Sequence, residues 1–214
     1  MEGRFDLVGI RDSSFRIREG NVPLKTLSSI LWWLSVVTWF TAIVASGAAA
    51  ISAFTQLPPL EATMPGIEAY YGDDSAGAAK FVAGYVTNPI FLVGDIVCLS
   101  AALGCVLALA TSRLQPCGSG RAGILAVICV MIAGGALGTY LLLVAPPLAD
   151  ALAEWRTAVL ADDREAASAA WALFDPLHHT ASRLMNAQMA LLLIAVVSGA
   201  AAITRIPDRK SADS

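Results

Sequence analysis

The residues best suited to chemistry lie in a chain that is otherwise strongly apolar. Asp95 falls inside an apolar stretch, and a second polar group occupies the segment Asp175-Pro176-Leu177-His178-His179-Thr180-Ala181-Ser182-Arg183-Leu184-Met185-Asn186. In a helix, His179, Ser182 and Asn186 share one face, because they lie three and seven positions apart. We expect a polar cluster that joins these side chains to Asp95 and Tyr140, with His178 beside it and Arg183 as a candidate ion-pair partner of Asp95.

Four interpretations of this cluster are open. A histidine titrates near neutral pH, which suits a proton-linked step. Asp95 with one or both histidines offers oxygen and nitrogen ligands for a metal ion. The same groups can line a path for a small polar solute, or they can form a structural hydrogen-bond network that fixes helix register. An ionised Asp near the centre of a membrane costs about 2.5–3.5 kcal/mol, so Asp95 is expected to face other helices and to be paired or protonated.

Other chemistry has little support in the sequence. GxSxG, HExxH and a P-loop are missing, and no GxGxxG opens a helix after a strand, so we expect a protein that is not an enzyme and has no cofactor. The cysteines at positions 98, 105, 117 and 129 form no CxxC pair, which argues against a zinc or dithiol site. The formal net charge of −3, with scattered Lys and Arg, argues against nucleic-acid binding.

Composition predicts that a membrane holds the cluster. Apolar residues make up 57% of the 214 residues and charged residues 14%, and the mean hydropathy is +0.66. A span needs about 20 mostly apolar residues. Four stretches qualify, at about 27–54, 89–111, 122–145 and 184–203. The predicted fold class is therefore an all-α, integral membrane four-helix bundle, a transmembrane domain over 27–205 that has the lipid bilayer as its first partner.

Basic residues predict the direction of the spans. Lys and Arg are frequent in the amino-terminal segment 1–26, in the turn between the second and third spans, and in the tail 206–214, and they are rare in the long segments 55–88 and 146–182. By the positive-inside rule both termini are expected in the cytoplasm. The Ala-rich and Gly-rich composition suggests a bacterial inner membrane.

The two long outer segments carry helix signals of their own. Asp74-Ser75 is expected to cap a short helix that runs through Tyr85. In the second segment, Pro146-Pro147 marks a break from the third span, and an apolar stripe follows at Leu148, Leu152, Trp155 and Val159. Asp162 with Glu165 reads as a capping box for a helix over 166–174, and Asp175-Pro176 as the start of the fourth span. We expect short outer-side helices that cap the bundle, either as packing or as a gate.

Small residues are expected to pack the spans against one another. Helices in lipid associate through close contact of small side chains. The candidate packing positions are Gly47, Gly104, Gly134, Gly138 and Gly199, of which Gly134 and Gly138 have GxxxG spacing. This pattern suits packing within one chain or between copies.

The fourth span resembles the closing motif of the four-helix family of transmembrane protein 205, a domain of unknown function in bacteria. The resemblance rests on His179-x-x-Ser182-x-Leu184-x-Asn186 after Phe174, on Ala145-Pro146, and on Trp39, Thr41 and Gly47. The chain departs from the family at Asn88-Pro89-Ile90-Phe91, where a Phe-Pro is usual, and Asp95 is not carried over from it. The resemblance implies a membrane protein of poorly defined biochemistry, with relatives loosely linked to resistance to, or export of, metal-containing compounds.

Two functions follow from these features. The first is an accessory or interaction subunit that packs against other membrane protein subunits or against itself, as small size and small-residue faces suggest. The alternative is a small transporter or exporter of a polar solute or metal compound that uses the Asp and His cluster.

Overall fold

The computed structural model describes residues 24–112 and 120–204, and within these ranges it is helical and contains no strand. The elements in chain order are α1 (Leu24–Gln56), η1 (Pro58–Leu60), α2 (Glu68–Tyr71), α3 (Ser75–Thr111), α4 (Arg121–Thr139), η2 (Tyr140–Val144), α5 (Ala145–Leu160) and α6 (Arg164–Thr204). The predicted all-α class is confirmed. The predicted tail, most of the amino-terminal segment, and the turn that holds Cys117 lie outside the described residues.

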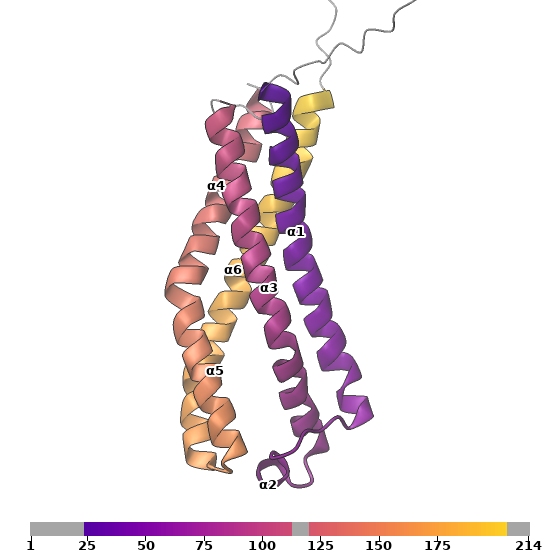
Figure 1. The fold of residues 1–214 in the computed structure, drawn as a ribbon, viewed down its shortest axis with the longest axis vertical. Helices are drawn as coiled ribbons and strands as arrows, with labels where there is room; N and C mark the ends of the chain where they lie inside the picture. The colour runs from indigo at the N-terminus through magenta and orange to yellow at the C-terminus, as the bar shows by residue number, and fades with distance from the viewer. Residues whose placement is uncertain (1–23, 113–119, 205–214) are drawn as a thin grey trace, which may run out of the picture.

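Four long rods run side by side in alternating directions (Figure 1). α4, η2 and α5 form one continuous rod, so the rods are α1, α3, α4–η2–α5 and α6. Each rod is long and apolar enough to cross a membrane. We call the end that carries Leu24 and Thr204 the terminal end, and the end that carries 57–74 and 161–163 the loop end. The alternation places the first and last described residues at the same end.

The rods are longer than a bilayer is thick. The helix α3 has 37 residues, which at about 1.5 Å per residue is roughly 55 Å, against about 30 Å of hydrocarbon. Large exposed apolar side chains are closely spaced along the rods as far as Val86 on α3 and Leu143 on η2, and they are more scattered toward the loop end, at Leu60, Tyr85, Leu160, Trp171 and Leu173. Toward the loop end, charged residues follow them, at Lys80, Asp150 and Arg183. The apolar band therefore occupies the terminal end and middle of the rods, and the loop end projects beyond it.

The expected breaks at proline residues do not occur. Pro89 lies inside α3 and Pro176 inside α6, and neither helix ends there. A proline removes one N–H from the helix ladder, and packing on both sides can hold the helix through that loss. Before Pro146 and Pro147, the chain forms the π-helical turn η2, which loosens the ladder one turn ahead of the two rings. The stretches expected to be separate capping helices are therefore helical but continuous with the spans.

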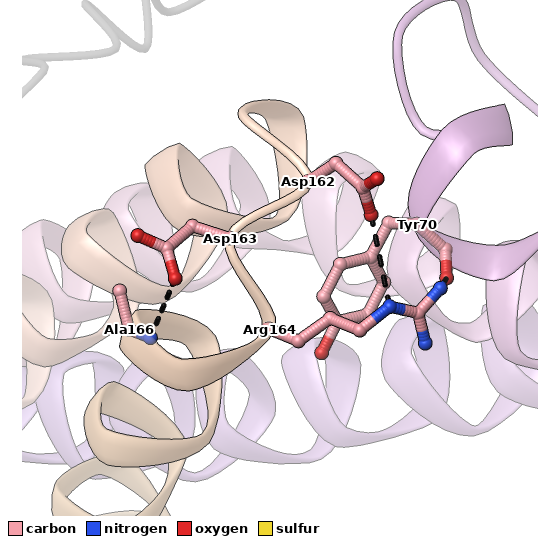
Figure 2. Close-up of polar contacts among 5 residues, drawn as sticks. All are labelled: Tyr70, Asp162, Asp163, Arg164 and Ala166. Atoms are coloured by element: carbon pink, nitrogen blue, oxygen red, sulfur yellow. Dashed lines mark hydrogen bonds and ion pairs between the residues drawn. The ribbon is translucent and has the colours of Figure 1, made fainter.

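Of the two helix caps expected at aspartates 74 and 162, the first is confirmed and the second is wrong. Asp74 caps α3 as expected, because its Oδ1 accepts a hydrogen bond from the N–H of Gly77 at 2.9 Å. At the start of α6 the capping residue is Asp163, whose Oδ1 accepts from the N–H of Ala166 at 3.0 Å (Figure 2). Asp162, the predicted cap, instead turns the chain with a positive φ of 52°. The short helices of the loop end are η1 and α2.

α1 packs mainly on α3, and the rod α4–η2–α5 packs mainly on α6. The contact between α1 and α3 depends on glycine. A Cβ atom at Gly104 would overlap Ser35 Oγ and lie 3.3 Å from Ser35 Cβ, and a Cβ atom at Gly94 would lie 2.5 Å from Ser46 Oγ. At the terminal end, the hydroxyls of Ser28 and Thr111 share a hydrogen bond of 2.8 Å.

The other predicted packing glycines differ in their surroundings. A Cβ at Gly134 would lie 4.0 Å from the ring of Trp39, which is ordinary contact, and Gly199 is buried on α6. Around Gly47 and Gly138 a Cβ would meet nothing within 4 Å. Gly104 is thus confirmed as a close-contact position, whereas Gly47 and Gly138 are not contacts within the chain.

Two packed cores lie along the bundle. The larger core draws on all four rods inside the apolar band, and its most buried large side chains are Trp32, Val36, Trp39, Cys105 and Leu192. The smaller core lies at the loop end and joins Ile67, Ala78, Phe81, Ala158, Val159 and Ala167. The second core means that the loop end is packed structure in its own right.

Candidate functional site: a carboxyl–phenol pair between the rods

One hydrogen bond inside the apolar band joins the two pairs of rods. The hydroxyl of Tyr140, on η2, donates to Asp95 Oδ2, on α3, at 2.9 Å. Tyr140 is buried, with 8% of its surface exposed, and Asp95 is half-buried. Asp95 and Tyr140, predicted to meet from the sequence, do meet.

Local backbone structure positions both partners. Tyr140 begins the π-helical turn, and its carbonyl accepts from the N–H of Ala145, five residues on. Such turns are rare and occur frequently at functional sites. On the other side, Gly94 precedes Asp95 and allows α3 to lie close to Ser46 of α1.

The surroundings of the pair are apolar. Leu92, Val93 and Ile96 are exposed large apolar side chains on the same helix, so Asp95 lies within the apolar band. A charged group in that band is costly unless a polar partner offsets the loss of water. The Tyr140 hydroxyl is such a partner, because a phenol is a good donor to a carboxyl oxygen.

Further polar groups are buried in the bundle. Gln188 on α6 is 2% exposed. The indole Nε1 atoms of Trp33 and of the fully buried Trp39 have no hydrogen-bond partner among the described residues. Buried polar groups are normally paired. The interior of the bundle therefore has unused hydrogen-bonding capacity in addition to the Asp95–Tyr140 pair.

The remaining predicted cluster residues lie along α6 and interact within that helix. Ser182 Oγ donates to the carbonyl of His178 at 2.9 Å, and His179 Nε2 lies 3.7 Å from Asp175 Oδ1. The ring of His178 stacks on Phe174, with 5.4 Å between ring centroids.

Arg183 does not pair with Asp95. Across 24–112 and 120–204, the salt bridges are Arg164–Asp162 and His179–Asp175, so the expected Arg183–Asp95 ion pair is wrong. Arg183 and Asn186 are exposed. The reason is the direction of the side chains: Arg183 and Asn186 are exposed on α6, whereas Asp95 faces Tyr140 between the rods.

The metal interpretation finds no ligand set in the described part of the chain. No group of three or more His, Cys, Asp or Glu side chains there is placed to hold a metal ion. His178 and His179 are neighbours in sequence, and their ring centroids are 6.2 Å apart.

Sequence reasoning missed Gln188, Trp39 and Gly94 as parts of this region. Gln188 carried a usable signal, because it is an amide inside an otherwise apolar stretch. The indole of Trp39 and the contact at Gly94 carried none, because their roles depend on which helix lies opposite.

The fold and this pair define a class: a four-span helical membrane protein with a carboxyl–phenol pair between its rods. No protein-family model, curated protein or solved structure matches the chain. The resemblance to the family of transmembrane protein 205 stays a prediction.

Proposed function

We propose that this protein is a small, non-catalytic membrane carrier, and that a polar solute with N–H donors docks on Asp95. The observation that carries the proposal is the Tyr140–Asp95 hydrogen bond, which links the α1–α3 pair to the α4–η2–α5 and α6 pair inside the apolar band.

The arrangement supports exchange of partners at Asp95. A solute N–H group can replace the Tyr140 hydroxyl on the carboxyl oxygen, so the link between the pairs of rods is released when the solute binds. The unpartnered indole Nε1 of Trp39 is a further hydrogen-bonding group in the larger core, and Gln188 is buried on α6. Packing within each pair is closer than packing between pairs, which favours a rocking movement of one pair against the other.

Uptake into liposomes tests this function. The probes are radiolabelled guanidinium and methylammonium, two small cations with N–H donors. We expect the purified protein to take up one or both faster than empty liposomes do, and Asp95→Asn to abolish the difference. The matched control is Asp150→Asn, which removes an exposed carboxylate beyond the apolar band and is expected to leave uptake unchanged. Equal uptake by the wild type and Asp95→Asn would contradict the proposal.

An accessory role is the second candidate, and the open glycine face favours it. At Gly135 and Gly138 on α4, a Cβ would meet nothing within 4 Å, so another membrane helix can approach there closely. In this case extraction in mild detergent yields the protein together with stoichiometric foreign subunits, and Gly138→Leu breaks that complex. Extraction of the protein without foreign subunits would contradict the accessory role.

For orientation, we propose a bacterial inner membrane with the terminal end in the cytoplasm. The support is the distribution of Lys and Arg in the sequence and the placement of Leu24 and Thr204 at one end of the rods. The test places single cysteines in 57–74 and labels them on intact cells with an impermeant reagent. Labelling is expected, and protection of those cysteines would show the opposite orientation.

A further inference from the structure

An open, shallow hollow lies at the loop end, away from Asp95, and four of its lining side chains are aromatic. It has a volume of about 350 Å³ and is lined by Tyr70, Tyr71, Trp155, Ala167, Ser168 and Trp171. These residues come from α2, α5 and α6. The volume is near the lower limit for small-molecule sites, which are roughly 300–1,000 Å³.

The rings around this hollow present faces in different directions. Tyr70 and Tyr71 meet edge to face, with centroids 5.0 Å apart and planes at 70°. Trp155 and Trp171 are tilted by 55°, with centroids 5.1 Å apart. Trp171 is 43% exposed although it is a large aromatic side chain outside the apolar band. Several ring faces around one space are the arrangement that proteins use to hold organic cations.

A side-chain cation of the protein already lies against one ring of the hollow. The guanidinium of Arg164 lies over the ring of Tyr70, 5.2 Å from its centroid, and donates to the Tyr70 carbonyl at 2.8 Å. Asp162 Oδ1 lies 3.8 Å from Arg164 Nε (Figure 2) and offsets that charge. Trp155 packs against Phe81, Trp171 and Phe174. The ring that offers open surface to a second cation is therefore Trp171, which is 43% exposed.

The charge of the loop end also favours a cation. The segments 57–88 and 146–183 contain ten Asp or Glu residues against four Lys or Arg residues, a net charge of −6 with histidine neutral. Burial, with smaller contributions from Tyr70 and Asp74, raises the pKa of Tyr71 to about 12. The Tyr71 phenol is therefore uncharged at neutral pH and contributes a ring face and a hydroxyl.

The hollow lies well along the rods from the Asp95–Tyr140 pair. Trp155 follows Tyr140 by fifteen residues on the same rod, and fifteen helical residues span about 22 Å. The acidic segments of the loop end lie near it in the chain, which favours a water-soluble ligand over an apolar one.

We propose that this hollow binds a small, water-soluble organic cation, of the quaternary ammonium class, against the exposed ring of Trp171, with Tyr71 and Trp155 beside it. The proposal does not depend on the carrier function proposed for Asp95.

Isothermal titration calorimetry on the full chain in maltoside micelles tests it, because maltosides have no ammonium group. The probes are choline and its uncharged isostere 3,3-dimethylbutan-1-ol. We expect saturable binding of choline, at least tenfold weaker binding of the isostere, and at least a tenfold loss of choline affinity in Trp171→Ala. The control is Leu173→Ala, an exposed apolar residue of α6 outside the hollow, which is expected to bind choline as the wild type does.

Four results would overturn the proposal. Three are the absence of saturable choline binding, equal binding of the isostere, and unchanged affinity in Trp171→Ala. The fourth is displacement of choline by added phosphatidylcholine, which would show a lipid-headgroup site. Asp95→Asn is expected to keep choline binding, so failure of the carrier proposal and failure of this one can be told apart.

Discussion

Substitution of Gly104 by alanine probes the closest contact in the apolar band. The new Cβ would overlap Ser35 Oγ and lie 3.3 Å from Ser35 Cβ, so α1 and α3 must move apart or Ser35 must rotate. Gly138 offers a matched control, because it also lies on a span and a Cβ there meets nothing within 4 Å.

The magnitude follows from two opposing contributions. Replacing glycine by alanine inside a helix gains up to about 1 kcal/mol of helix stability. Overpacking a close contact costs about 1–3 kcal/mol. Since the first contribution is common to both positions, the difference between Gly104→Ala and Gly138→Ala isolates the contact. We expect Gly104→Ala to be less stable than Gly138→Ala by about 1–3 kcal/mol.

The assay is reversible unfolding in mixed micelles, with sodium dodecyl sulfate as the denaturant and circular dichroism as the signal. The double variant Ser35→Gly with Gly104→Ala completes a thermodynamic cycle, and the glycine at 35 should remove most of the contact cost. A difference between the two single variants below about 0.5 kcal/mol, which is within the usual error of additivity, would refute the close contact.

Three further predictions concern other contacts. Arg156→Gln removes the 2.9 Å hydrogen bond from the guanidinium to the Gly84 carbonyl, and it should destabilise the loop end by about 1 kcal/mol, seen as faster proteolysis of the 57–74 segment. Tyr140→Phe removes the hydrogen bond to Asp95 and should cost about 0.6–1.7 kcal/mol in the same micelle assay, as is typical of hydrogen bonds between membrane helices; a cost near zero would contradict the pairing. Because burial raises the pKa of Tyr71 to about 12, Tyr71→Phe should leave the phenolate absorbance unchanged in a titration from pH 8 to 11, and a lower absorbance in the variant would contradict that shift.

The sequence predicted the class of fold well, because apolar length alone identifies spans. The ends of the helices were harder to predict. The prolines at 89 and 176 are strong stop signals locally, yet α3 and α6 continue through them. Tertiary packing decides such cases, and a single sequence does not reveal it. The π-helical turn before Pro146 had no sequence signal that we recognised.

The candidate site was predicted in part for a similar reason. Asp95 was identifiable because a carboxyl in an apolar stretch needs a partner, and Tyr140 lay at a comparable depth on the next span. His178, His179 and Arg183 were expected beside Asp95 because the helical spacing does not show which face of α6 lies against α3. In the structure the carbonyl of His178 accepts from Ser182 and His179 lies by Asp175, both within α6, and Arg183 is exposed.

Cys98 gives the most direct test of the central claim that the rods separate at the Asp95–Tyr140 pair. It lies three residues after Asp95 on α3 and is 5% exposed. The measurement is its labelling by an impermeant methanethiosulfonate reagent in liposomes, in a variant with alanine at the other three cysteine positions. We expect slow labelling of Cys98 in the otherwise native protein and faster labelling in Tyr140→Phe. Loss of the Tyr140–Asp95 hydrogen bond favours the state in which the two pairs of rods have moved apart. Complete protection of Cys98 in both, while the unfolded protein reacts fully, would show a static bundle and contradict the account.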